Sequence, residues 1–256
     1  MKNNARKEFW EIRSKSFPGY TQGESYQTRM LEVMKDNHVN FSGKTVLDLG
    51  CGTGAYTIHI AKEAAHVTAL DISEGMLAKV KAAAANENIN NISYVCSDWL
   101  EFQEQKQFDI VFCSLTPAIC DRGAVQKAHG YAAEQLINIC MTGGMNAHTL
   151  RELYSAHGIE RKTKNSLEPH VRNWLDENNF DYKIVNVKGA WETFRSFDDM
   201  LANFRDVLEA NKYEVDDTIT QKYTQQLKDE GTGLYKSITH YDVEMIIHNI
   251  KQQGLA

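Results

Sequence analysis

Short apolar runs alternate with segments of helical periodicity from residue 44 onward. Four such runs occur, at 44–49, 66–70, 92–96 and 108–115. Between them, apolar residues recur at helical spacing over 55–65 and again after Ser73, which is a suitable helix N-cap. Strands that are apolar along their whole length, separated by helices, are typical of a parallel sheet covered on both faces. The alternation predicts an α/β fold.

The second half of the chain has a weaker pattern. We expect a helix over 124–138, a fifth strand over 139–148, and two more strands over 181–187 and 241–248. Together with the four earlier runs, these strands predict one mostly parallel seven-stranded sheet with helices on both faces. Residues 189–235 lie between the last two predicted strands, and we interpret them as a helical insertion.

The chain length is compatible with one elaborated domain. It has 256 residues, and single α/β domains often reach about 250 residues. We therefore expect an N-terminal helical segment over 1–40 and one main domain over 41–256 that contains the insertion.

A glycine-rich segment, VLDLGCGTG at residues 46–54, joins the first predicted strand to the helix that follows it. In open parallel sheets, ligands bind outside the carboxyl ends of the strands, near the point where the strand order reverses. Glycines there permit a tight turn and a close approach of the backbone to a ligand. The N–H groups at the start of a helix favour a negative group. This segment is therefore a candidate ligand-binding loop.

Two ligand classes are compatible with such a loop. Gly50 to Ala55 fit the dinucleotide pattern G-x-G-x-x-G/A, and Asp71 about 20 residues further on would suggest NAD and an oxidoreductase. Gly54, however, gives a G-x-G-x-G spacing, and Asp48 stands just ahead of the first glycine. A carboxylate at that place suits a ligand that carries an ammonium and a sulfonium, and it is a poor neighbour for a pyrophosphate. The spacing favours the cationic ligand.

VLDLGCGTG resembles, nearly residue for residue, the first motif of class I S-adenosyl-L-methionine (SAM)-dependent methyltransferases. Asp71, at the end of the second strand, resembles the acid that binds the ribose hydroxyls, and Asp98, after the third strand, resembles the residue that meets the adenine amino group. Phe108–Val111 resembles the fourth motif of the family. The resemblance covers residues 43–120 and implies a Rossmann-like fold, SAM as cofactor and methyl transfer as the activity.

The chemistry of the residues is compatible with these roles. Carboxylates accept hydrogen bonds from vicinal hydroxyls and from an amino group. Aliphatic and aromatic side chains such as Ile72, Met76 and Trp99 can pack on an adenine ring. Core packing is the alternative for Trp99, and covering the loop is the alternative for Tyr56. The expected cofactor-binding residues are Asp48, Gly50, Cys51, Gly52, Gly54, Tyr56, Asp71, Ile72, Met76, Asp98, Trp99 and Ser114.

The sequence gives no candidate catalytic residue. Methyl transfer from a sulfonium can draw several kcal/mol from holding donor and acceptor in line, so a catalytic triad is not required. The nine histidines are scattered and form neither an H-x-x-x-H nor an H-E-x-x-H pattern. A metal site is therefore not expected.

The acceptor is expected to be a small molecule of a kind that the sequence does not reveal. Family members that methylate amino groups often carry N/D-P-P-Y/F after the fourth strand, whereas this chain has SLTPA at 114–118. That departure, together with a net charge of −6, disfavours nucleic acid as a partner. A non-catalytic SAM-binding module is the alternative that the missing acceptor motif leaves open.

The resemblance also implies that residues 1–40 form a helical lid over the cofactor. Trp10, Arg13 or Tyr20 could then reach the SAM carboxylate, and ordinary packing of an aromatic stripe is the alternative. The five cysteines form no CxxC pair, the N-terminus has no apolar core of signal-peptide length, and no run approaches ~20 apolar residues. These observations predict a soluble cytoplasmic protein without membrane association, and they leave its oligomeric state open.

Overall fold

The computed structural model describes residues 2–142, 148–160 and 169–250. The chain divides into two compact units. The first, here called the sheet unit, comprises 18–140, 168–186 and the chain from 244 onward. The second, here called the helical unit, comprises 1–17, 141–167 and 187–243.

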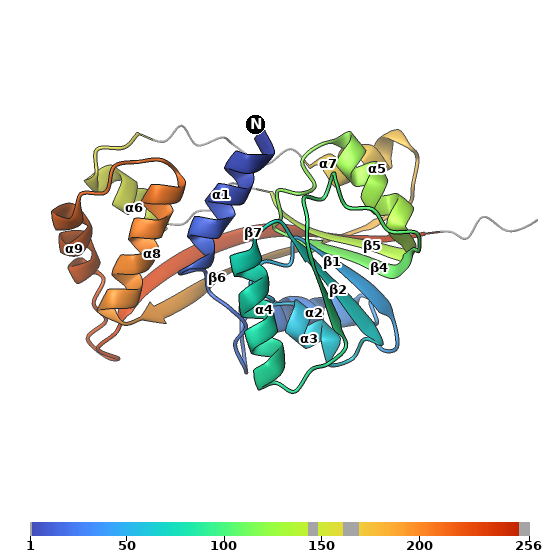
Figure 1. The fold of residues 1–256 in the computed structure, drawn as a ribbon, viewed down its shortest axis with the longest axis horizontal. Helices are drawn as coiled ribbons and strands as arrows, with labels where there is room; N and C mark the ends of the chain where they lie inside the picture. The colour runs from blue at the N-terminus through green and yellow to red at the C-terminus, as the bar shows by residue number, and fades with distance from the viewer. Residues whose placement is uncertain (1, 143–147, 161–168, 251–256) are drawn as a thin grey trace, which may run out of the picture. The chain divides into compact units, whose positions relative to one another are not determined.

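One seven-stranded sheet has the strand order β3-β2-β1-β4-β5-β7-β6 (Figure 1). The strands are β1 Thr45–Leu49, β2 His66–Asp71, β3 Ile92–Cys96, β4 Phe108–Ser114, β5 Ala132–Met141, β6 Lys183–Arg195 and β7 Tyr235–Asn249. The five neighbours from β3 to β5 pair in parallel. From β1 the chain moves outward through β2 to β3, and it then returns to β4 on the other side of β1. The order therefore reverses between β1 and β4, and the predicted fold class is confirmed.

Helices cover both faces of the sheet within the sheet unit. Figure 1 shows α2, α3 and α4 on one face and α5 and α7 on the other. These helices are α2 Tyr26–Asp36, α3 Thr57–Ala61, α4 Glu74–Asn86, α5 Arg122–Tyr131 and α7 His170–Glu177. The expected N-cap Ser73 accepts the Met76 N–H, and Asp121 caps α5 in the same way through Ala124.

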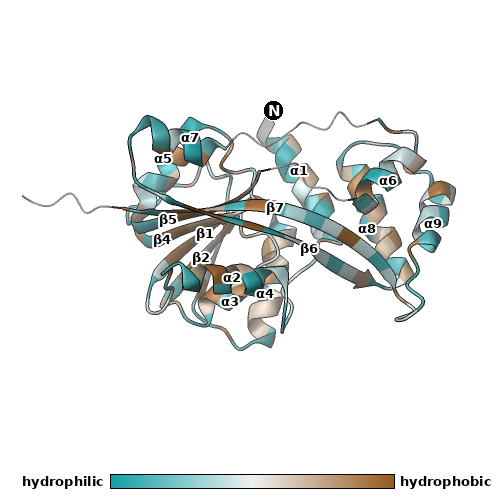
Figure 2. Ribbon diagram, turned by 180° about the vertical axis from the view of Figure 1, so that it is seen from behind, coloured by the Kyte–Doolittle hydropathy of each residue, from teal (hydrophilic) through white to brown (hydrophobic). Residues whose placement is uncertain are grey.

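The ribbons of β1, β4 and β5 are largely brown in Figure 2, and these strands lie between the two helix layers with most of their apolar residues buried. On the α3 and α4 face, the core contains Ile58, Leu77 and Val80. On the α5 and α7 face, it contains Leu47, Val111, Val125 and Leu175, among others. The strands are buried on both faces, which explains why they are apolar throughout.

The predicted helix over 124–138 is wrong in its second half. The helix α5 ends at Tyr131, and β5 begins at Ala132. Leu136 and Ile137 pair with Val111 and Phe112 of β4 and are buried. The strand that was expected over 139–148 therefore starts earlier and ends at Met141, and residues 143–147 lie outside the described residues.

The helical unit contains α1 Lys2–Ser14, α6 His148–Ala156, α8 Phe197–Ala210 and α9 Asp217–Gln226. Here α1 packs on α8, and α9 packs on both α6 and α8. Leu153, Phe204, Leu208 and Tyr223 are part of the core of this unit. The helical character of the insertion is seen in α8 and α9, but residues 189–195 belong to β6, and β7 begins at Tyr235. A lid role for residues 1–40 stays a prediction.

No helix in the described ranges combines the length and the apolar character needed to cross a membrane. All five cysteines lie in these ranges, and no disulfide joins any two of them.

Candidate functional site

The glycine loop after β1 needs glycine at two positions for steric reasons. Gly50 has φ 70° and Gly54 has φ 83°. A Cβ atom at Gly50 would lie 2.1 Å from Thr116 Oγ1, and one at Gly54 would lie 2.9 Å from a methyl carbon of Val80. The Gly50 N–H donates to the Leu70 carbonyl at 2.8 Å, which fixes the loop to the end of β2. These glycines allow the loop to pack closely against its own scaffold.

Gly52 has a different environment. Its φ is 55°, and a Cβ atom there would meet nothing within 4 Å. Its N–H donates to Asp71 Oδ2 at 2.8 Å. The backbone at this residue therefore borders open space beside a carboxylate, as expected where a ligand approaches the main chain closely.

Two acids lie at the carboxyl ends of neighbouring strands. Asp71 ends β2, is 9% exposed, and accepts the Ser73 N–H through Oδ1 at 2.9 Å. The parallel register places Cys96, the last residue of β3, beside Asp71. Asp98 follows two residues later, is also 9% exposed, and accepts the Leu100 N–H at 2.8 Å. Asp71 and Asp98 are thus held by backbone donors at one edge of the sheet.

Asp48 is the most enclosed acid of the site. It lies in β1, its exposed fraction is 3%, and Thr57 donates its hydroxyl hydrogen to Oδ2 at 2.6 Å. Burial raises the pKa of Asp48 to about 7; the hydrogen bond from Thr57 lowers this pKa, and the nearby Asp71 carboxylate raises it. The carboxyl group is therefore close to balance between its neutral and charged forms at neutral pH.

Tyr56 places a phenol beside these acids. It precedes α3, is 8% exposed, and its ring lies 5.0 Å from that of Phe112. Its hydroxyl is buried and makes no hydrogen bond of good geometry within the described residues. Burial raises its pKa well above 10; Tyr26 raises it further, and Ser114 at the end of β4 lowers it. Tyr56 therefore remains a neutral phenol that can donate to a ligand.

Tyr26 is a neighbour of Tyr56 that sequence reasoning missed. It is the first residue of α2, after the Ser25 capping box, and it acts on Tyr56 from that helix. Only the packing of α2 on the sheet brings it there, and its immediate sequence carries no motif that would single it out.

Three predicted contacts lie around the start of α4 and after β3. Met76 is buried in the first turn of α4, and Ile72 is partly exposed. Trp99 is 3% exposed; its indole N–H donates to the Ala124 carbonyl at 3.1 Å, and its ring stacks on Phe102. Trp99 therefore packs in the core, as the alternative to cofactor contact expected. Contact of Ile72, Met76 and Trp99 with a cofactor stays a prediction.

The aromatic residues near the N-terminus have partners of their own. The Arg13 guanidinium donates to Asn203 in the helical unit at 3.4 Å, and the ring of Trp10 packs against Phe9. In the sheet unit, the Tyr20 hydroxyl donates to Glu87 at 3.3 Å. These contacts agree with the packing alternative, and a role in binding the SAM carboxylate stays a prediction.

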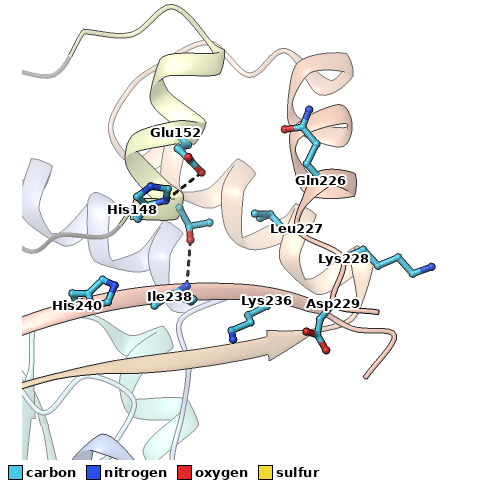
Figure 3. Close-up of a pocket in the computed structure, with 10 residues that line it drawn as sticks. His148, Glu152, Gln226, Leu227, Lys228, Asp229, Lys236, Ile238 and His240 are labelled. Atoms are coloured by element: carbon cyan, nitrogen blue, oxygen red, sulfur yellow. Dashed lines mark hydrogen bonds and ion pairs between the residues drawn. The ribbon is translucent and has the colours of Figure 1, made fainter. Parts of the chain in front are cut away.

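A separate pocket of about 440 Å³ lies in the helical unit (Figure 3). Its lining comes from α6, from the end of α9, from the α9–β7 connection and from β7. His148 pairs with Glu152 at 3.4 Å, the Tyr223 hydroxyl also donates to Glu152, and Lys236 pairs with Glu192 at 2.7 Å. None of the predicted site residues lines this pocket.

Comparison with known proteins identifies the central part of the chain. A family described as a methyltransferase domain matches residues 46–136, which include the glycine loop, Asp71 and Asp98. Phosphoethanolamine N-methyltransferase 1 of Triticum aestivum is 32% identical over 143 residues, which cover 51% of this chain and 28% of that protein. A ubiquinone biosynthesis O-methyltransferase of Coxiella burnetii is 36% identical over 80 residues, 30% of this chain and 33% of that protein. The chain thus spans about a third or less of the length of these curated relatives.

The fold extends the similarity over nearly the whole chain. Magnesium protoporphyrin IX methyltransferase from Synechocystis PCC 6803, crystallised with S-adenosylhomocysteine (SAH), is 16% identical, with a TM-score of 0.53 over 94% of this chain and 99% of that one. At this identity the likeness is one of fold. The family match and the strand order confirm the prediction made from the motifs. Residues 46–136 of this chain match a methyltransferase domain, and the sheet around them has the strand order of a Rossmann-like fold.

Proposed function

We propose that this protein is a SAM-dependent enzyme that transfers a methyl group to a small-molecule acceptor. The observation that carries the proposal is the row of acids at one end of the sheet. Asp48 lies just before the end of β1, Asp71 ends β2 and Asp98 follows β3, and the open space at Gly52 lies beside Asp71. The relatives from Triticum aestivum and Coxiella burnetii are named for N- and O-methylation of small molecules, which supports this acceptor class.

The residues present fit SAM. Asp71 is placed to accept hydrogen bonds from the ribose hydroxyls, and Asp98 from the adenine amino group. Asp48 offers a carboxylate to the cationic amino-acid end, while Gly52 lets the backbone approach the ligand. SAM supplies an activated methyl group on a sulfonium. The protein contributes orientation and the exclusion of water, because holding two reactants in line lowers the barrier by several kcal/mol.

The remaining predicted contact residues line the same proposed SAM site. Gly50 and Gly54 shape the loop, and Cys51 and Ser114 border it. Tyr56 acts as a hydrogen-bond donor rather than a base, because burial raises the pKa of its phenol.

Calorimetry with SAH tests cofactor binding directly. We expect saturable binding with a dissociation constant well below about 1 mM. A thermal-shift comparison of SAH with NADH separates the oxidoreductase alternative, because the ligand that binds the folded state raises the melting temperature. Incubation of cell extract with SAM tritiated on the methyl group then tests transfer. Binding of SAH without any labelled product from any extract would favour a non-catalytic SAM-binding module.

We further propose that the protein works in the cytoplasm. Its five cysteines form no disulfide, and Cys113 is fully buried as a thiol, as is usual in a reducing compartment. The net charge of −6 supports a small-molecule partner over nucleic acid.

Replacing Asp71 with alanine is expected to weaken SAH binding by about 1.5–3 kcal/mol, the contribution of hydrogen bonds to a charged group. The substitution also leaves the Gly52 and Ser73 N–H groups without their carboxylate acceptor. Calorimetry at one pH measures the loss. Asp109→Ala removes a carboxylate at the opposite end of β4 and serves as a control that should leave the affinity unchanged. Full affinity in Asp71→Ala would show that the ribose is held elsewhere.

The Tyr56→Phe substitution separates binding from folding. It removes a buried hydroxyl that makes no well-formed hydrogen bond in the described residues, so the free energy of unfolding should stay the same or rise by about 1 kcal/mol. If the phenol donates to the ligand, SAH affinity should fall by about fivefold, equivalent to about 1 kcal/mol. Tyr131→Phe, whose hydroxyl donates to the Glu104 carbonyl, is the control. Unchanged affinity in Tyr56→Phe would remove this residue from the site.

A further inference from the structure

The Asp48 carboxyl group lies in the middle of the sheet. Its strand, β1, is flanked by β2 and β4, and Asp48 is in register with Ala69 on one side and Phe112 on the other. The side chain is almost completely buried, and the Thr57 hydroxyl donates to one of its oxygens. Asp48 is thus removed from water near the carboxyl end of β1, where the strand order reverses.

The ionisable groups around Asp48 are neutral or acidic. From the loop and from α3, they are the Cys51 thiol and the Tyr56 phenol. The strand β2 contributes the Asp71 carboxylate to this surrounding, and β4 contributes the Cys113 thiol. Within the described part of the chain, no basic side chain forms an ion pair with Asp48.

A buried carboxylate without a cationic partner is unfavourable, so its neutral, protonated form is favoured. Burial accordingly raises the pKa of Asp48 to about 7. A ligand cation placed next to the same carboxyl group would reverse this balance, because an opposite charge within a few ångströms favours the ionised form. The missing partner is thus a cation that arrives with the ligand.

We propose that a cationic ligand entering the glycine-loop site displaces the proton of Asp48, so that cofactor binding is coupled to proton release. The O–H bond of the carboxyl group breaks, the proton passes to the solvent buffer, and the carboxylate pairs with the ligand cation. Below neutral pH, protons and cofactor therefore compete for one site. The identity of the ligand as SAM or SAH rests on the function proposed above.

Three related ligands identify the cation responsible. SAM carries an ammonium and a sulfonium, SAH carries only the ammonium, and 5′-methylthioadenosine carries neither while keeping the adenosine group. We expect SAM and SAH to release a proton and 5′-methylthioadenosine to release none. Proton release with SAM alone would assign Asp48 to the sulfonium and would equally support the coupling.

Calorimetry in buffers of different ionisation enthalpy counts the protons released. At pH about 6, we expect roughly one proton per SAH bound, and at pH about 8 close to none. The SAH affinity should be about tenfold weaker at the lower pH. In Asp48→Asn, neither the proton release nor this pH dependence should remain. Asp98→Asn is the matched control: it weakens adenosine binding but keeps the proton release.

The outcomes separate the coupling from the function. If both SAM and SAH bind at pH about 6 without releasing a proton, the coupling is overturned and the proposed function is left intact. Proton release that persists in Asp48→Asn, or that also occurs with 5′-methylthioadenosine, would overturn it as well. SAH is expected to bind Asp48→Asn weakly. For this variant, the number of protons released is therefore measured a second time, with SAH displacing 5′-methylthioadenosine that is already bound. Absence of binding by all three ligands would overturn the proposed function itself.

Discussion

Replacing Asp48 with asparagine is expected to stabilise the folded protein above pH 7 by up to about 4 kcal/mol while it abolishes the tight binding of SAH. The carboxyl group is buried, and its pKa rises from 3.8 to about 7 on folding. Each pKa unit corresponds to 1.36 kcal/mol, which gives the expected magnitude. Asparagine has nearly the same shape, and its amide oxygen can still accept the Thr57 hydroxyl hydrogen.

The sign of the pH dependence follows from linkage. Because the folded state holds the Asp48 proton more tightly than the unfolded state does, this group's contribution to stability is fully present below pH 3.8. The contribution is lost as the pH rises toward about 7, and it is absent above that value. The stability gain of Asp48→Asn should therefore be small at low pH and largest above neutral pH.

Denaturant unfolding of the wild type and Asp48→Asn at several pH values measures the difference. Asp98→Asn, at the same edge of the sheet, controls for the general effect of removing a carboxylate and should show no comparable gain at high pH. Equal stability of the wild type and Asp48→Asn at pH about 8 would mean that a cation inside the protein already compensates the charge. A stabilised variant that cannot bind its cofactor would show that this acid is kept for binding at the expense of the fold.

Replacing Gly50 with alanine is expected to destabilise the protein by about 2–5 kcal/mol. The added Cβ atom would lie 2.1 Å from Thr116 Oγ1 and 2.7 Å from Thr116 Cβ, so the clash reaches the stem of that side chain. Overpacking of this kind costs about 1–3 kcal/mol. The φ of 70° adds about 1–2 kcal/mol for a residue with a side chain.

Gly43→Ala is a matched control for the backbone contribution. Gly43 has the same φ of 70°, and a Cβ atom there would meet nothing within 4 Å. Gly43→Ala should therefore lose only the stability that the positive φ costs. The difference in the free energy of unfolding between Gly43→Ala and Gly50→Ala then measures the cost of the clash with Thr116. Adding Thr116→Gly to Gly50→Ala should recover much of this difference. If Gly50→Ala and Gly43→Ala lose equal stability, the predicted contact with Thr116 does not limit the loop.

The edge that holds the site could be predicted from the sequence because its pattern is local. An apolar strand, a run of glycines and an acid are encoded within nine residues at 46–54, and Asp71 and Asp98 follow their own strands in the same way. The parallel register then brings these strand ends together without any further information. Local signals were sufficient to predict that these acids lie at neighbouring strand ends, and their role in binding stays a prediction.

The features that the sequence did not reveal depend on distant contacts. Residues 132–138 are rich in alanine, glutamate, glutamine and leucine, all good helix formers, and only pairing with β4 makes them a strand. Tyr26 lies near Tyr56 because α2 packs on the sheet, and its own segment carries no motif. The high pKa of Asp48 likewise arises from its burial by residues distant in the sequence, which no short sequence pattern can express.

The packing of α1 on α8 has a consequence for synthesis on the ribosome. The two helices meet through contacts such as Arg13 with Asn203, which are 190 residues apart in the chain. At about 5–20 residues per second, α1 emerges roughly 10–40 s before its partner exists. During that interval its apolar face has no native surface to cover it. The first helix of a newly made chain therefore waits without its native partner until translation passes residue 210.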